Sequence, residues 1–206
     1  MKITIAITTA IIMSANTWAA QPSRAAEHKV TVCIAREPAA YYLPHAELMA
    51  SKMFAAIGVK LNWRAQHSCP AGGAIQIGIS VKTSANEFPG ALAHALPYEG
   101  VHIVVFYDRI NHSFSGEPAT GILLAHVLVH EITHVLEGVD RHSDTGVMKA
   151  HWIPADYGQM LAKLLPFTDW DIQLIHAGIQ SRAVRLAARD ITAEMASTGH
   201  FSIAFP

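Results

Sequence analysis

The sequence predicts an α+β domain in which several strands precede one long helix and further helices follow it. Short apolar, β-branched segments bounded by turn residues lie before residue 108, and longer patterns with helical spacing lie after residue 117. Hydrophobic residues make up 51% of the 206 residues and charged residues 15%, which allows a sizeable core and argues against disorder. Because no linker or internal repeat divides the chain, residues 28–206 are expected to form a single domain.

The strands are predicted from short apolar runs. In chain order they cover residues 30–35, 59–63, 74–80, 92–96 and 102–107, of which 92–96 is a short candidate edge strand.

The helices are predicted from apolar residues at a spacing of three and four. The first covers residues 44–58 with Gly58 as its stop, and its expected buried stripe consists of Leu48, Met49, Phe54 and Ile57. The long helix begins at Pro118, because proline favours the first helical turn. Three more segments are expected to be helical: residues 156–165, residues 168–178, and the chain from residue 181 onward, which leads into an apolar tail.

The most informative motif lies in the long helix and reads H-E-I-T-H-V-L-E-G-V-D-R-H-S-D-T-G-V-M over residues 130–148. Residues four apart share one face of a helix, so His130 and His134 can bind the same metal ion. Gly138 can close the helix in a left-handed conformation, after which His142 can return as a third ligand. Three histidines suit Zn²⁺ and leave one position open for water, as a catalytic site requires.

Glu131 lies beside these ligands but cannot share their direction. It suits a group that accepts the proton of a zinc-bound water as that water attacks a peptide carbonyl, and that then protonates the leaving amine. The motif therefore predicts a zinc-dependent hydrolase of peptides or proteins. A bare H-E-x-x-H also arises by chance, but the apolar helix, the glycine and the third histidine favour a metal site.

His126 is a competing candidate ligand, because it also lies four residues before His130. It is one turn further from the loop that would bring in His142. A buried histidine that packs or supports the site is therefore the preferred interpretation.

The N-terminus has the pattern of an export signal. Lys2 precedes an uncharged apolar stretch, and Thr17 and Ala19 would occupy the two recognition positions for cleavage after residue 19. Residues 1–19 are thus predicted to be a signal peptide, with an uncleaved membrane anchor as the alternative. We expect a secreted or periplasmic protein without stable membrane association after cleavage, and no other stretch is expected to span a bilayer.

The charge and the cysteines of the chain limit which binding partners and which cellular compartment we expect. The formal net charge is -1 and no basic cluster stands out, which argues against a nucleic-acid partner. After export, Cys33 and Cys69 could form a disulfide that ties the loop around Cys69 to the sheet, although the sequence does not show that the two are close. The oligomeric state stays open.

The order of elements and three motifs resemble the catalytic domain of metzincin metallopeptidases, a group of zincins. The zinc motif with its glycine and third histidine is the first. The second, residues 143–148 (S-D-T-G-V-M), resembles the segment from the third ligand to the Met-turn of matrix metalloproteinases. The third, residues 90–97 (G-A-L-A-H-A-L-P), resembles their edge-strand stretch. The whole pattern looks closest to uncharacterised exported bacterial proteins that share H-E-x-x-H-x-x-x-G-x-x-x-H-S-x-x-G-x-M.

This resemblance implies a metzincin-like fold, with a mixed twisted sheet beside the long active-site helix. It implies that the zinc ligands are His130, His134 and His142, and that Glu131 is the general base. Met148 would form the hydrophobic floor under the metal, the alternative being an ordinary core methionine. The edge strand at residues 92–96 would pair with an extended substrate, the alternative being a purely structural edge.

The sequence departs from the metzincin pattern in its spacing, because three residues rather than two lie on each side of Gly138. A wider loop would then bring in the third histidine. His94 matches a histidine that helps bind a second, structural zinc in matrix metalloproteinases, and His102 is nearby. The accompanying motifs are not evident, so no second zinc is predicted. His151 and Tyr157 are candidates for stabilising an oxyanion, with structural roles preferred.

Two other functions stay open. One is a zinc-stabilised binding protein without turnover, although a structural zinc does not need a carboxylate such as Glu131 beside its ligands. The other is a zinc hydrolase of a non-peptide amide, such as cell-wall material.

Overall fold

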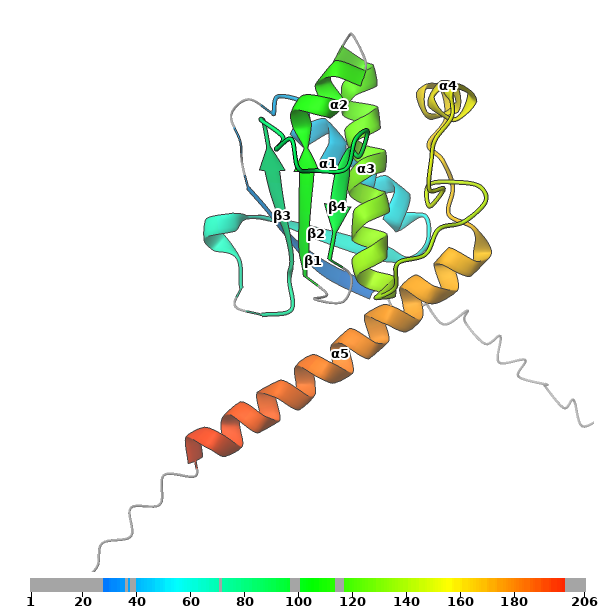
Figure 1. Cartoon of the computed structure of the whole chain (residues 1–206). Coiled ribbons are helices and arrows are strands. Elements are labelled where there is room, and N and C mark those ends of the chain that lie inside the picture. Colours follow the sequence, from blue (N-terminus) through cyan, green and yellow to red (C-terminus); the bar gives the residue numbers. More distant parts are fainter. Residues whose placement is uncertain are drawn as a thin grey trace, which may run out of the picture.

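The computed structural model of the chain describes residues 28–35, 37, 40–70, 72–96, 101–113 and 117–198. Helices pack on a five-stranded sheet, and the last helix extends beyond it (Figure 1). The strands are β1 (His28–Ile34), β2 (Val59–Ala65), β3 (Ile75–Ser80), β4 (Ala93–Ala95) and β5 (His102–Phe106). The helices are α1 (Leu43–Ala55), α2 (Tyr107–Ser113), α3 (Glu117–Glu137), α4 (Pro154–Ala162) and α5 (Asp169–Thr198), with a 3-10 turn at Gln66–Ser68.

The sheet is mixed and has the strand order β2-β1-β3-β5-β4. β1 pairs in parallel with β2 and β3, and β3 pairs in parallel with β5. β4 runs antiparallel to β5 at the edge, where the sequence predicted an edge strand. The predicted α+β class, with a mixed sheet, a long helix and C-terminal helices, is confirmed.

α3 is the central helix of the core. Its residues 123–129 and 131–136 are all buried, and it packs against α1, β4 and β5. By length and composition, Pro118–Glu137 could also cross a membrane, which the sequence analysis did not allow for. In this fold 83% of its apolar window is buried, as expected for the core helix of a globular domain.

The buried face of α1 differs from the predicted stripe. Leu48 is 54% exposed, whereas the alanines at positions 46 and 50 are fully buried together with Phe54. Small residues permit close packing between helices, and Gly121 of α3 indeed lies against the side chain of His45. The prediction was wrong for Leu48 and confirmed for Phe54, and Met49 and Ile57 are partly buried against the core. It overlooked the small residues, because it counted large apolar side chains only.

The two C-terminal helices predicted over residues 168–178 and from residue 181 form one continuous helix, α5. Gly178 does not end it. A Cβ atom at position 178 would lie 1.8 Å from the carbonyl oxygen of Leu136, so only glycine fits where α5 crosses the end of α3. Beyond this crossing α5 passes the loop before β3, where Arg182 donates to the carbonyl of Gly73 at 3.1 Å, and its later turns extend past the sheet (Figure 1). The predicted apolar tail and the predicted signal peptide lie outside the described residues.

Cys33 and Cys69 form a disulfide, with their Cα atoms 5.8 Å apart. Cys33 is buried in β1, so the bridge attaches the loop after β2 to an interior strand of the sheet. The sequence-based expectation of this bridge is confirmed. The short helix α2 was not predicted, because only two of its seven residues, Tyr107 and Ile110, are apolar and buried, too few to show a helical period.

Candidate metal centre

The three histidines of the motif lie together at the end of α3. The Nε2 atoms of His130 and His134 are 3.0 Å apart. One nitrogen from each of His130, His134 and His142 lies within 4.8 Å of the others, a group that could hold a metal ion. His130 and His134 belong to α3, whereas His142 lies on the exposed loop that follows it.

The chain reaches this arrangement through the turn at Gly138. Its φ of +70° lies in the left-handed region, as predicted, and its amide donates to the carbonyl of His134 at 2.9 Å. α3 therefore ends one turn after His134. The three residues that follow Gly138 form the loop that carries His142 back to the helix.

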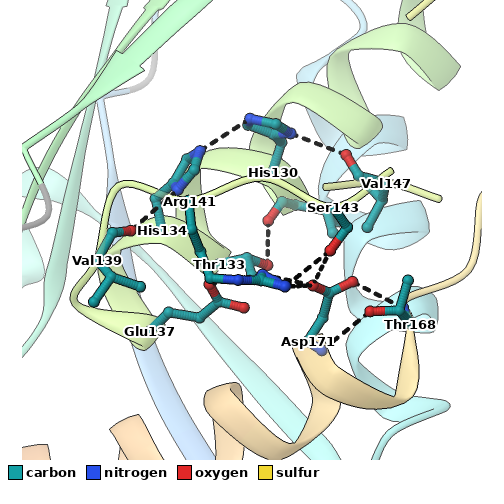
Figure 2. Close-up of polar contacts among 11 residues, drawn as sticks. His130, Thr133, His134, Glu137, Val139, Arg141, Ser143, Val147, Thr168 and Asp171 are labelled. Atoms are coloured by element: carbon teal, nitrogen blue, oxygen red, sulfur yellow. Dashed lines mark hydrogen bonds and ion pairs between the residues drawn. The ribbon is translucent and has the colours of Figure 1, made fainter. Parts of the chain in front are cut away.

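Backbone carbonyls orient the two helical histidines (Figure 2). The Nδ1 atom of His130 lies 2.9 Å from the oxygen of Val147, and that of His134 lies 3.4 Å from the oxygen of Val139. A carbonyl can only accept, so each Nδ1 carries the hydrogen. The Nε2 lone pairs are then free to point into the cluster, the arrangement that supports metal-binding histidines in proteins.

Burial keeps these imidazoles neutral. It lowers the pKa of His130 to about 3, with His134 as the next cause, and it lowers the pKa of His134 to about 4, with His142 as the next cause. Burial also lowers the pKa of His142. Neutral imidazole is the form that binds a metal, so at neutral pH the cluster needs no deprotonation before binding.

Glu131 is 8% exposed on α3. Burial, and secondly the charge of Asp140, raise its pKa to about 8. The Asp140 charge also acts on His142, which lies two residues later on the same loop. A cation held by the histidines would favour the ionised form of Glu131, because opposite charges stabilise each other.

The segment after His142 forms a closed turn beside His130. The amide of Ser143 donates to the carbonyl of Met148 at 2.8 Å, and Gly146 has a φ of +77°. A Cβ atom at Gly146 would lie 2.3 Å from the carbonyl oxygen of Pro166. Met148 is fully buried in the core, and its neighbour Val147 supplies the carbonyl that orients His130.

Both ring nitrogens of His126 are hydrogen-bonded, so neither is available to bind a metal ion. Its Nδ1 atom donates to the carbonyl of Ile122 at 2.7 Å, and its Nε2 atom accepts from the amide of Leu165 at 3.1 Å. The interpretation of His126 as a buried supporting residue is confirmed. It attaches α3 to the chain segment that leads into α5.

The sequence analysis missed three residues near the histidines, Trp152, Arg141 and Asp171. The ring of Trp152 lies edge-on to His130 at 5.7 Å between centroids, and Tyr157 packs against Trp152. Arg141 and Asp171 form a polar network under the His142 loop (Figure 2). A sequence signal existed only for Asp171, because T-x-x-D at residues 168–171 is a helix-capping pattern.

The other candidate residues lie in different surroundings. The Nδ1 atom of His94 on β4 lies 3.4 Å from a carboxylate oxygen of Glu87, and its ring packs against Phe106. His102 begins β5, on the strand next to β4. His151 lies on the exposed chain after the turn, where its charge would lower the pKa of His142.

Comparisons with known proteins add a fold likeness. No protein-family model matches the chain, and no curated protein matches it significantly. Among solved structures the chain is similar to archaemetzincin from Methanopyrus kandleri, at 14% identity over 76% of this chain and 98% of that chain, with a TM-score of 0.48. At this level of similarity, a function is argued from the chain's own geometry. That geometry is an α+β domain with a three-histidine cluster that could hold a metal ion.

Proposed function

We propose that the chain is a zinc-dependent metallopeptidase of metzincin-like fold, with His130, His134 and His142 as ligands and Glu131 as general base. The observation that carries this proposal is the cluster of three neutral imidazoles, two of them oriented by carbonyls, together with a buried carboxylate at the position after His130 in the chain. Structural zinc sites almost always use four protein ligands. Within the described part of the chain this cluster has three, which favours a site with an open position.

The donor set fits zinc, because neutral imidazole nitrogens are among its preferred ligands. Zn²⁺ held there would supply a Lewis acid that polarises a carbonyl oxygen and acidifies a water molecule. Glu131 would take the proton from the attacking water and pass it to the leaving nitrogen. Glu131 lies on α3 and is 8% exposed, so bulk water has little access to its carboxylate.

The sheet edge supports a peptide as the substrate. β4 pairs with β5 on one side and forms the end of the described sheet on the other. It also packs near α3, the helix that carries the histidines, and its three residues are half-buried. An extended peptide could add to this edge through main-chain hydrogen bonds, which would place its backbone alongside the metal centre.

Cleavage of a diverse peptide library by the zinc-loaded protein tests the proposal, with Glu131→Gln run beside it and the zinc content of both measured. We expect cuts by the wild type that are missing in the variant, at equal zinc content. Wild-type protein that holds no zinc near 1:1 would overturn the metal site. Zinc in both proteins without any cut would instead favour a binding role or a non-peptide amide substrate.

We also propose that the protein is exported, with residues 1–19 removed as a signal peptide. The disulfide between Cys33 and Cys69 supports this, because such bridges persist in oxidising compartments and are rare in the cytosol. Mass spectrometry of the protein recovered from a bacterial export host tests the cleavage. A mature chain that begins at residue 20 is expected, whereas a membrane-bound chain that retains residues 1–19 would identify an anchor.

A further inference from the structure

A buried carboxylate attaches the His142 loop to α5 (Figure 2). Oδ1 of Asp171 accepts from both terminal nitrogens of Arg141, at 2.9 and 3.0 Å, and from the hydroxyl of Ser143 at 2.6 Å. The same Arg141 nitrogen that lies 3.0 Å from Asp171 also donates to the Ser143 hydroxyl, at 2.9 Å. We call these three residues, Arg141, Ser143 and Asp171, the loop clamp.

The other side of Asp171 is fixed in the first turn of α5. Its Oδ2 atom accepts from the amide of Thr168 at 2.8 Å, and its own amide donates to the Thr168 hydroxyl at 3.2 Å. This reciprocal pair is a capping box, which orders the start of a helix. Asp171 is 0% exposed, so the charge-assisted bonds from Arg141 act in a surrounding of low dielectric, where they are strong.

α5 is in turn fixed to the helix that carries the other two ligands. Gly178 lies seven residues after Asp171, two helical turns along the same face, and it is where α5 touches the backbone of Leu136 in α3. The same helix therefore contacts α3 directly at Gly178 and contacts the His142 loop at Asp171. α5 therefore sets the distance between the His142 loop and α3.

His142 depends on such support more than its two partners do. It is exposed, and in the described residues no hydrogen bond holds its ring, whereas His130 and His134 are each oriented by a carbonyl. The residues on either side of His142 are Arg141 and Ser143, the two donors of the loop clamp. The clamp therefore holds the backbone at His142 from both sides.

We propose that Asp171 is a positioning residue for the third metal ligand, so that docking of α5 on the His142 loop and metal binding by His142 stabilise each other. This inference rests on the proposed function, because it takes His142 to be a zinc ligand. Coupling between two binding events is reciprocal. Loss of the clamp therefore weakens metal binding, and metal binding makes the first turn of α5 harder to open.

The test compares Asp171→Asn with Asp169→Asn, which makes the same charge change on an exposed residue in the same turn of α5. Zinc affinity is measured by competition with a chromophoric chelator, and the visible spectrum of the Co²⁺-substituted protein reports the ligand geometry. For Asp171→Asn we expect a folded protein with an altered Co²⁺ spectrum. Its zinc affinity should be lowered by about 10–100-fold, the usual effect of losing a residue that holds a metal ligand in place. Asp169→Asn should match the wild type.

Three further variants distinguish a failure of the positioning role from a failure of the metal site. If Asp171→Asn fails to fold, Ser143→Ala and Arg141→Lys weaken the clamp while keeping Asp171, and they should lower zinc affinity by smaller factors. Wild-type affinity and spectrum in all clamp variants, together with a loss in His142→Ala, would overturn the positioning role and leave the proposed metal site intact. Unchanged affinity in His142→Ala would overturn the three-histidine site itself, and the positioning role with it.

Discussion

The helical side and the loop side of the proposed metal centre are positioned by different means. His130, Glu131 and His134 lie within five residues of one buried helix, so their relative directions follow from the helical period. His142 lies on an exposed loop that is anchored to a residue thirty positions later in the chain, through Arg141 and Asp171. The comparison shows that one short motif can combine locally determined residues with one that depends on the tertiary structure.

The helical side should supply the largest chemical effect. Glu131→Gln keeps the size of the side chain but removes the base, so hydrolysis should fall by about 10²–10⁴-fold, the usual contribution of a general base. Zinc content should not change, because Glu131 is not among the clustered ligands. Steady-state rates with a cleaved peptide, beside metal analysis, measure both quantities. A variant that retains full activity would remove Glu131 from the mechanism.

Replacing one histidine at a time compares the helical side and the loop side of the proposed metal centre directly. His134→Ala removes an imidazole that α3 and the Val139 carbonyl hold in place, and it should lower zinc affinity more than His142→Ala does. Each loss should exceed the about 10–100-fold expected for outer-shell changes. Chelator competition on both variants measures the order. A larger loss in His142→Ala would mean that the loop, and not the helix, supplies the dominant ligand.

A methyl group at position 178 should disrupt the packing of α5 against α3. Gly178→Ala would place a Cβ atom 1.8 Å from the Leu136 carbonyl oxygen, and we expect a loss of about 1–3 kcal/mol in the free energy of unfolding. Gly158→Ala in α4 is the matched control, because nothing lies within 4 Å of its Cβ position. Alanine favours helices over glycine, so this control should keep or raise stability. Equal urea midpoints for both variants would contradict the tight crossing.

The smallest expected effect is a pH dependence from His126. Burial lowers its pKa below the value of 6.5 that it would have when unfolded. Between these two values the unfolded chain binds more protons, so His126 contributes stability above about pH 6.5 that is lost as the pH falls toward its folded pKa. Urea midpoints of the zinc-free protein between pH 8 and 5 should fall less steeply in His126→Gln than in the wild type. Parallel curves would contradict a neutral, buried His126.

Local sequence patterns were enough to predict the elements that depend on interactions between neighbouring residues. The α3 helix with its motif follows from apolar spacing, a proline start and the left-handed Gly138, which all act within a few residues. The edge strand before β5 was likewise visible as a short apolar run. The pairing of Cys33 with Cys69 was a reasonable expectation only because the chain has two cysteines.

The roles of the other residues depend on contacts between segments that are distant in the sequence. Gly178 looks like a helix stop in the sequence, and it is a crossing point only because the end of α3 passes at that position. Asp171 looks like an ordinary capping residue until Arg141 and Ser143 are brought against it. Helical period and turn chemistry act over a few residues and can be read along the chain. Close approach and burial of charge depend on which segments meet in three dimensions, which no short stretch of sequence contains.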